Sequence, residues 1–289
     1  MTTRRLICNA DDFGYGPRVT DGIVDAHTGG IITSTTVMTN MPAAEYAAGL
    51  MPGLPDLGVG VHLVLTCGQA LSPRDQVPDL TDREGQFHPL AKQIKLLRRP
   101  SEALANQIQT EWRAQIQRAI DLGFAITHCD SHHGVHKYPV CRKVLVGLLQ
   151  TFKIPAVRAA IRYRWHGQPP ANGWVGWLKR LPASLGNRLN ERAYRTANIA
   201  LVDQYLNIDS LPGQGRGRTE QLAHAIGMLP TGTTEMAFHP GHDDPSTPDR
   251  AEYRPVRIAD FNALTDPAVK EALEQHAVQA ISYRELIKH

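Results

Sequence analysis

The sequence has few cysteines and no pattern that would pair them. Only four cysteines occur among its 289 residues, and no two are spaced as C-x-x-C. A chain of this length can bury enough apolar surface to fold without disulfides. The sequence therefore predicts reduced thiols, and we expect the protein in the cytoplasm.

Long apolar segments and a strong excess of one charge are also missing. No run approaches the roughly 18 apolar residues of a membrane-spanning helix. The apolar stretch after Arg4 and Arg5 stops at Asn9, too early for a signal peptide. The 31 Lys and Arg residues against 28 Asp and Glu residues give a net charge of only +3. We therefore expect no integral membrane segment and no nucleic-acid partner.

The chain has no internal repeat, no low-complexity tract and no Gly/Ser linker, which favours one domain over residues 1–289. Short apolar runs closed by polar turns alternate with longer helical segments, as in parallel α/β proteins and (β/α) barrels. The expected strands are Leu6–Ala10, Gly58–Leu65, Phe124–Asp130, Ala156–Ala160, Glu235–Phe238 and Val278–Ile281. The clearest helix follows the N-cap Ser101 and ends at Gly123. Its apolar residues recur every fourth position, at Leu104, Ile108, Trp112, Ile116 and Ile120.

Residues 165–195 interrupt this alternation and form an expected helical insertion. Three of the four tryptophans, Trp165, Trp174 and Trp177, lie here together with five basic residues. One interpretation is a surface excursion whose tryptophans pack on the barrel or on a second subunit. The other is a lid or an aromatic platform for a sugar.

Four of the thirteen histidines fall within nine residues, directly after an expected strand. They are His128, His132, His133 and His136, and Asp130 lies among them. Imidazoles and a carboxylate at the carboxyl end of a parallel strand are typical of a divalent metal site. A hydrogen-bonded polar turn is the alternative.

Other strand ends offer further ligands. Asp11 and Asp12 follow the first strand, and both can enter one site only if the backbone curls there, because adjacent strand residues point to opposite faces. With His62, one aspartate and two histidines would leave coordination positions open for water and substrate. His239 is either an acid or oxyanion partner or a turn-capping histidine. Arg158 either reaches the site from its own strand end or forms a structural salt bridge.

Four spaced motifs resemble those of the YdjC/ChbG-type carbohydrate deacetylases. They are Asn9–Gly14, Gly60–Thr66, Thr127–His136 and Phe238–Gly241, and the segments Ile31–Thr36 and Ile281–Leu286 extend the likeness from the first strand to the last. The resemblance implies a distorted TIM-like (β/α) barrel with a mainly parallel sheet. It also implies a divalent metal ion, a homodimer, and removal of acetyl groups from N-acetylated sugars such as chitooligosaccharides.

Carried over to this chain, the family's metal ligands are Asp12, His62 and His132. Asp11 takes the position of the catalytic base, and His239 lies in the C-terminal site motif. The implied reaction is hydrolysis of the acetamide, with the ion polarising the carbonyl and Asp11 deprotonating the attacking water. His239 or His136 would protonate the departing amine.

Further contacts and the metal stay open at the level of sequence. We expect His136, Arg158 and Asp130 to bind the substrate. Two imidazoles and one carboxylate suit Zn²⁺, whereas the family is generally described as magnesium-dependent, so Mg²⁺ and Zn²⁺ are both candidates.

The chain departs from the family at one position: Gly134 stands where a third consecutive histidine is common. We expect altered substrate contacts there, with the ligand His132 kept. One alternative function is a metal- and sugar-binding homologue without turnover, with Gly134 as the mark of lost activity. Another, suggested by the tryptophans and basic residues of 165–195, is a deacetylase of a lipid- or polymer-linked amino sugar. A phosphohydrolase is disfavoured because the chain has no P-loop or other Gly-rich phosphate-binding loop.

Overall fold

The computed structural model describes residues 3–158, 189, 191–207, 217–243 and 253–287. Within these ranges all strands belong to one parallel sheet of eight. The strands are β1 (Arg4–Phe13), β2 (Ser34–Val37), β3 (Gly58–Leu63), β4 (Ile126–Ser131), β5 (Ala156–Val157), β6 (Gln204–Asn207), β7 (Gly232–Phe238) and β8 (Val278–Ala280). The predicted α/β class with a mainly parallel sheet is confirmed.

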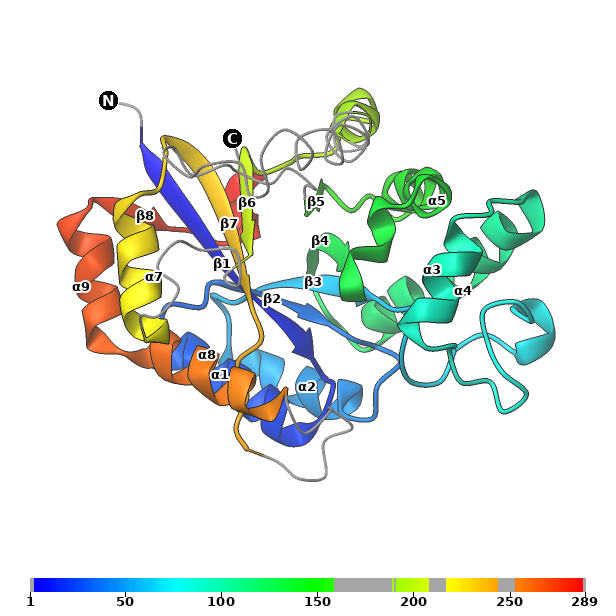
Figure 1. Cartoon of the computed structure of the whole chain (residues 1–289), viewed down its shortest axis with the longest axis horizontal. Coiled ribbons are helices and arrows are strands. Elements are labelled where there is room, and N and C mark those ends of the chain that lie inside the picture. Colours follow the sequence, from blue (N-terminus) through cyan, green and yellow to red (C-terminus); the bar gives the residue numbers. More distant parts are fainter. Residues whose placement is uncertain (1–2, 159–188, 190, 208–216, 244–252, 288–289) are drawn as a thin grey trace, which may run out of the picture.

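The sheet curls into a distorted barrel (Figure 1). Its longest strand, β1, lies between β2 and β7 in the sheet. The order is β5-β4-β3-β2-β1-β7-β6. One edge of β1 pairs with β7, and the other edge pairs with β8 at Arg4–Leu6 and with β2 further along. A single parallel bridge between Ala156 and Ala200 links β5 to the segment that leads into β6. The ring is therefore closed by one bridge, which makes the barrel irregular.

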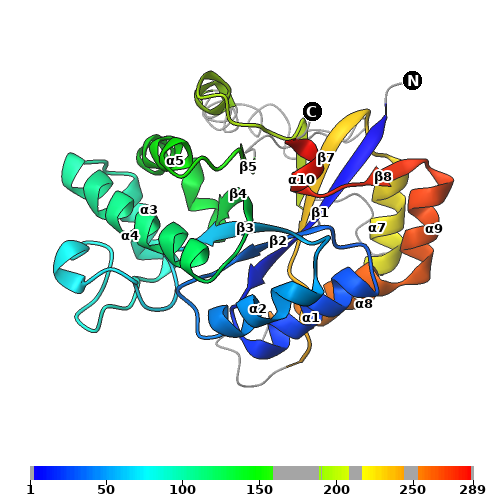
Figure 2. The ribbon, with the colours of Figure 1, turned by 180° about the vertical axis from the view of Figure 1, so that it is seen from behind.

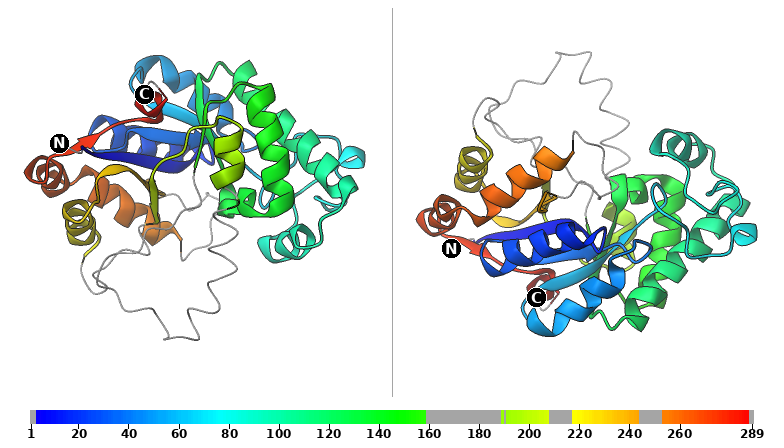
Figure 3. Two further views of the ribbon diagram at one scale, coloured as in Figure 1. Left: turned by 90° about the horizontal axis from the view of Figure 1, so that it is seen from above. Right: turned by 90° about the horizontal axis from the view of Figure 1, so that it is seen from below.

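Helices surround the strands on the outside (Figures 1 and 3). The α-helices are α1 (Pro17–Thr28), α2 (Ala44–Leu50), α3 (Leu90–Leu97), α4 (Glu102–Asp121), α5 (Pro139–Thr151), α7 (Arg218–Gly227), α8 (Arg254–Thr265), α9 (Pro267–Gln275) and α10 (Tyr283–Leu286). In the described part of the chain, three 3₁₀ helices join them, η1 (Met51–Gly53), η2 (Arg74–Gln76) and η3 (His132–Lys137). Central strands are thus covered on both faces, and all six residues of β3 are buried, whereas two of the three residues of β8 are exposed.

Helix α4 follows the predicted pattern with one exception. The Ser101 hydroxyl accepts a hydrogen bond from the Leu104 N–H, and Gly123 has φ +85° just after the helix. Four predicted apolar residues, Leu104, Ile108, Trp112 and Ile116, are buried. Ile120, the last apolar residue of the pattern, is 42% exposed, and the helix ends one residue later.

Sequence patterns missed β2 and β6 as strands and overestimated the length of three others. Where Gly58–Leu65, Phe124–Asp130 and Val278–Ile281 were expected, β3 ends at Leu63, β4 begins at Ile126 and β8 ends at Ala280. Of the expected strand Ala156–Ala160, the first two residues form β5, and the last two lie outside the described residues. β2 was missed because Ser34, Thr35 and Thr36 look like a turn. Their hydroxyl groups are buried in the barrel, where Thr35 Oγ1 donates to the Ala10 carbonyl at 2.7 Å.

Most of the expected insertion at residues 165–195 lies outside the described residues, as do Trp165, Trp174 and Trp177. The insertion and the single-domain organisation stay predictions. Among the described helices, none has both the length and the apolar composition needed to cross a bilayer.

Candidate active site

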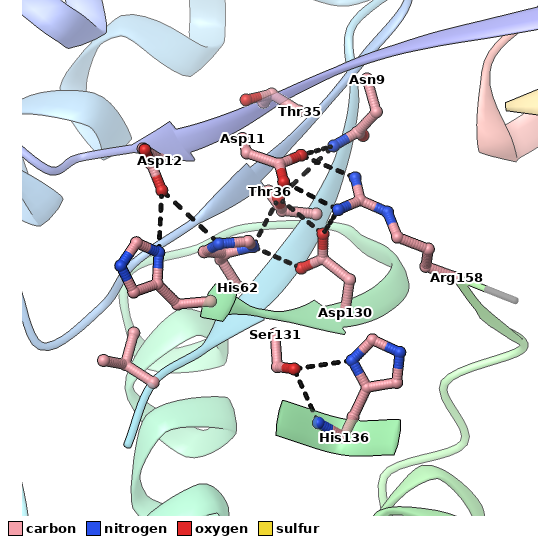
Figure 4. A network of polar contacts seen from close by, with 12 residues as sticks. Asn9, Asp11, Asp12, Thr35, Thr36, His62, Asp130, Ser131, His136 and Arg158 are labelled. Carbon is pink, nitrogen blue, oxygen red and sulfur yellow. Dashed lines mark hydrogen bonds and ion pairs between the residues drawn. The ribbon is translucent and has the colours of Figure 1, made fainter. Parts of the chain in front are cut away.

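The first strand ends in a backbone curl that brings two adjacent carboxylates into one site. Asp12 has φ +73°, in the left-handed region, and the register of β1 against β2 shifts between Ala10 and Phe13. Aspartate adopts this conformation more readily than most residues. The curl predicted at Asp11 and Asp12 is confirmed, and Figure 4 shows both side chains reaching the same group of polar residues.

Asp12 faces two histidines from other strand ends. Its Oδ1 atom lies 3.5 Å from His62 Nε2 and 3.3 Å from His132 Nδ1. This oxygen is buried yet accepts no hydrogen bond, and the three ligand atoms lie within 4.8 Å of one another. One carboxylate and two imidazoles pointing at a shared, unsatisfied position form a donor set that suits a divalent ion.

His62 is held in the orientation that directs Nε2 toward Asp12. Its Nδ1 lies 2.6 Å from Asp130 Oδ1, and Thr36 Oγ1 contacts both groups (Figure 4). Histidines that bind metals commonly donate their second N–H to a carboxylate in this way. Burial opposes a charge on His62, but Asp130, Asp11 and Asp12 outweigh it and raise its pKa to about 9. The carboxylates thus favour a positive charge here, which a proton or a metal ion can supply.

The buried charges around this position support the same conclusion. A connected set contains four carboxylates and two guanidinium groups, namely Asp11, Asp12, Asp130, Glu235, Arg158 and Arg257. With every group ionised, four negative and two positive charges leave a net charge of −2. Burial raises the pKa of Glu235. A protonated His62 would offset one of the two negative charges, and a divalent cation in place of that proton would offset both.

Asp11, the expected base, is clamped by Arg158. The guanidinium donates to both carboxylate oxygens, with distances of 2.7 Å and 2.6 Å. Burial alone would raise the pKa of Asp11, but Arg158, His62 and His239 outweigh it and hold the pKa well below its usual range. Asp11 is therefore ionised at neutral pH and able to accept a proton. Asn9 Nδ2 donates to the same carboxylate at 2.9 Å.

His239 lies across the site from the clamped carboxylate. Its Nε2 atom is 3.9 Å from Asp11 Oδ2, and its side chain is 25% exposed. Asp260 accepts a hydrogen bond from the His239 backbone N–H at 2.9 Å, and the ring of Tyr253 meets the imidazole edge to face. His239 thus lies where an imidazole can exchange a proton with a group near Asp11.

The histidine cluster of β4 and η3 divides into separate locations. His132 joins Asp12, while the ring of His133 packs against His132 at a tilt of 55° and contacts Thr66 Oγ1 through Nδ1 at 2.9 Å. His128 instead stacks on Tyr283 in the barrel interior. His136 is buried, and its Nδ1 lies 2.6 Å from Ser131 Oγ. Only His132 of the four is brought to Asp12.

The three residues expected to bind substrate are all buried. Arg158 contacts Asp11, Asp130 and Glu235, and Asp130 contacts His62 and Arg158. His136 contacts Ser131. These positions favour support of other site residues over direct contact with a sugar, and their binding of substrate stays a prediction.

Gly134 does not displace the neighbouring ligand. Both His133 and Gly134 adopt left-handed backbone conformations, with φ of +55° and +63°. A Cβ atom on Gly134 would approach Lys137 Nζ at 3.0 Å. His132 nevertheless faces Asp12, so the departure from the family motif leaves the candidate donor set intact.

Sequence reasoning assigned no role to several residues that complete the site. Arg257 of α8 donates to Asp12 Oδ2 at 2.8 Å, and Glu235 and Tyr283 lie behind Arg158. Thr36 and Tyr283 belong to recognised motifs, which could have signalled a role. No pattern in α8 indicates Arg257.

Comparisons with known proteins agree along nearly the whole chain. The model of the YdjC-like protein family matches residues 5–275. A carbohydrate deacetylase of Geobacillus stearothermophilus is 33% identical over 99% of each chain. One from Brevibacillus brevis is 32% identical over 98% of this chain and 99% of its own. A crystal structure from Enterococcus faecalis, named for a proposed cleavage of cellobiose phosphate, superposes with a TM-score of 0.80 at 28% identity, covering 99% of each chain.

Proposed function

This chain belongs to the YdjC-like protein family, and from that membership and its site we propose that it is a metal-dependent carbohydrate deacetylase. The substrate we propose is an N-acetylated sugar of the chitooligosaccharide type, whose acetamide is hydrolysed to a free amine and acetate. Relatives named carbohydrate deacetylase support the sugar and the reaction.

The observation that carries the proposal is the orphaned Oδ1 atom of Asp12 between two imidazoles. Asp12, His62 and His132 would hold the divalent ion, Mg²⁺ or Zn²⁺. When bound, such an ion supplies Lewis-acid polarisation of the acetyl carbonyl. His239, 3.9 Å from Asp11, is 25% exposed, so a substrate would reach the site from the side of this residue.

The chain's own residues perform the proton transfers in this mechanism. Asp11 is ionised, is fixed by Arg158 and accepts the proton of the attacking water. His239 Nε2, across from Asp11, donates a proton to the departing sugar amine. Arg257 fixes Asp12 and Asp130 fixes His62, so that neither has to reorganise during the reaction.

Three further parts of the proposal concern the setting of the enzyme. We propose a homodimer in the cytoplasm, and the soluble sugar as substrate in preference to a lipid- or polymer-linked one. The proposed base Asp11 and the proposed acid His239 both lie in the site beside the candidate ligands despite Gly134, which favours turnover over a binding role alone.

The test is acetate release from diacetylchitobiose by protein loaded with Mg²⁺ or Zn²⁺. We expect metal-dependent release, and we expect Asp11→Asn to lower kcat by about 10²- to 10⁴-fold, the usual contribution of a general base. Metal content should stay at the wild-type level, because Asp11 is not in the proposed ligand set.

The matched control is Asp121→Asn, which makes the same substitution at the exposed end of α4. It should leave kcat unchanged. Turnover by Asp11→Asn within a few-fold of wild type, at equal metal content, would remove Asp11 as the base. Activity indifferent to every divalent ion would contradict the metal proposal.

A further inference from the structure

The C-terminal segment Ile281–Leu286 has a defined structure that the proposed mechanism does not use. Ser282 caps α10 in a reciprocal capping box with Glu285, and the Tyr283 backbone N–H donates to Ser34 Oγ of β2 at 3.1 Å. Figure 2 shows α10 close to the strands, and it contacts β3 and β4. The cap and the β2 contact fix the backbone of Tyr283 relative to the barrel.

Tyr283 extends from α10 into the barrel interior. Its side chain is fully buried, and its ring stacks on His128 with centroids 3.7 Å apart and an interplanar angle of 11°. The phenol oxygen donates a hydrogen bond to Glu235 Oε2 at 2.6 Å. The ring packing therefore fixes the position from which the hydroxyl group reaches Glu235.

Glu235 connects Tyr283 to the arginine that clamps the base. Its other oxygen, Oε1, accepts a hydrogen bond from Arg158 Nε at 2.8 Å. The outer nitrogens of the same guanidinium contact Asp11 and Asp130. An uninterrupted series of contacts thus runs from the C-terminal helix to Asp11.

The contact at Nε matters because a guanidinium is planar and presents its N–H groups in fixed directions. The outer nitrogens of Arg158 contact two carboxylates, Asp11 and Asp130. These contacts alone would allow the guanidinium plane to shift from the Asp11 carboxylate toward the Asp130 carboxylate. The ring of Tyr205 lies against one face at 5.3 Å, and Glu235 fixes the Nε edge. Together they define both the tilt and the rotation of the plane.

We propose that Tyr283 and Glu235 are positioning residues, which orient the Arg158 guanidinium and thereby the carboxylate of Asp11. The C-terminal segment would then set the direction from which the base meets the attacking water. This inference rests on the proposed function, since it concerns the geometry of the same base.

Tyr283→Phe tests the inference, since phenylalanine keeps the ring stacked on His128 and removes only the hydroxyl group. We expect kcat for acetate release to fall about 3- to 10-fold, the effect of one hydrogen bond on a barrier, with KM within about two-fold of wild type. Bound metal should be unchanged. Tyr46→Phe is the matched control, because Tyr46 makes an equally short contact to Asp21 at the surface.

A double-variant cycle with Glu235→Gln separates this role from a general structural one. If the hydroxyl group acts through Glu235, kcat of the double variant should be close to that of Glu235→Gln alone. Independent, multiplicative losses would overturn the proposal. So would wild-type kcat in Tyr283→Phe, an equal loss in Tyr46→Phe, or a loss of metal that parallels the loss of kcat.

A spectroscopic measurement keeps the inference separate from the proposed function. The Nε–H signal of Arg158 in a ¹⁵N–¹H spectrum, assigned by its absence in Arg158→Lys, should shift in Tyr283→Phe and not in Tyr46→Phe. If wild type releases no acetate but the signal shifts, the proposed function fails and the positioning of Arg158 stands. An unshifted signal overturns the positioning whatever the activity.

Discussion

Asp12 combines a left-handed backbone with a buried, unsatisfied carboxylate oxygen. Asparagine tolerates the same backbone conformation, so Asp12→Asn should keep the curl while removing the negative charge of the ligand. We expect affinity for Zn²⁺ and Mg²⁺ to fall by more than the roughly 10- to 100-fold that loss of an outer partner of a ligand causes. Titration calorimetry measures the affinity, and circular dichroism checks the fold. Wild-type affinity in this variant would place the metal elsewhere.

Among individual site residues, sequence patterns identified only those at strand ends. The last residues of their strands include Asp11, Asp12 and His62, and His132 directly follows β4. The carboxyl ends of these strands meet at one edge, so the proximity of the four residues was predictable from motif and topology. Arg257 was not predictable, because its contact with Asp12 depends on how α8 packs more than 240 positions along the chain. His128 and His136 share the motif of His132, yet they point into other parts of the barrel.

Helix α4 carries a buried polar stripe beside its apolar one. Gln107, Glu111 and Gln115 recur every fourth residue and bind the backbone of the segment that follows β3. The Glu111 carboxylate accepts from the N–H groups of Leu71 and Ser72 at 3.1 Å and 2.9 Å. Glu111→Gln replaces one acceptor with a donor, so we expect the free energy of unfolding to fall by about 1–3 kcal/mol, measured by urea denaturation.

The control for this prediction is Glu102→Gln, the same substitution at an exposed position of the same helix. It should change the free energy of unfolding by no more than about 0.5 kcal/mol. Equal losses in the two variants would show that charge on α4, and not the backbone contacts of Glu111, stabilises the protein.

The two stripes of α4 also show what element-level patterns can reveal. Apolar residues at helical spacing are typical of a buried face, and four of the five in α4 are buried. Glutamine and glutamate at the same spacing look like a solvated face, so the polar stripe was not apparent. β2 was missed for the same reason, since its hydroxyl groups bind other buried atoms.

For the whole molecule, the barrel class was predictable and the content of its interior was not. Alternating short strands and helices indicate parallel α/β architecture whatever fills the centre. The polar interior joins residues from β1, β3, β4, β7 and α10, together with Arg158 just beyond β5. Such contacts exist only once the sheet has curled, so no local pattern contains them.

The polar interior makes stability depend on pH. Burial, and next the charge of Arg158, lower the pKa of His128 well below 6.5. As pH falls below about 6.5, the unfolded chain takes up a proton at this histidine and the native protein does not. Stability should therefore decline on acidification, by up to about 1.4 kcal/mol per pH unit from this group, until the pH reaches the lowered native pKa.

Urea unfolding at pH 7.5, 6.5 and 5.5 measures this dependence, and His128→Asn should reduce its slope by about the same 1.4 kcal/mol per pH unit below pH 6.5. The variant will be less stable at pH 7.5, because it loses the stacking contact with Tyr283. This loss is the same at every pH and does not change the slope of the unfolding free energy against pH. His224→Asn on the exposed face of α7 is the control for loss of any one histidine. If both variants keep the wild-type slope, the acid sensitivity arises from other groups, of which His136 is the next, because burial also lowers its pKa.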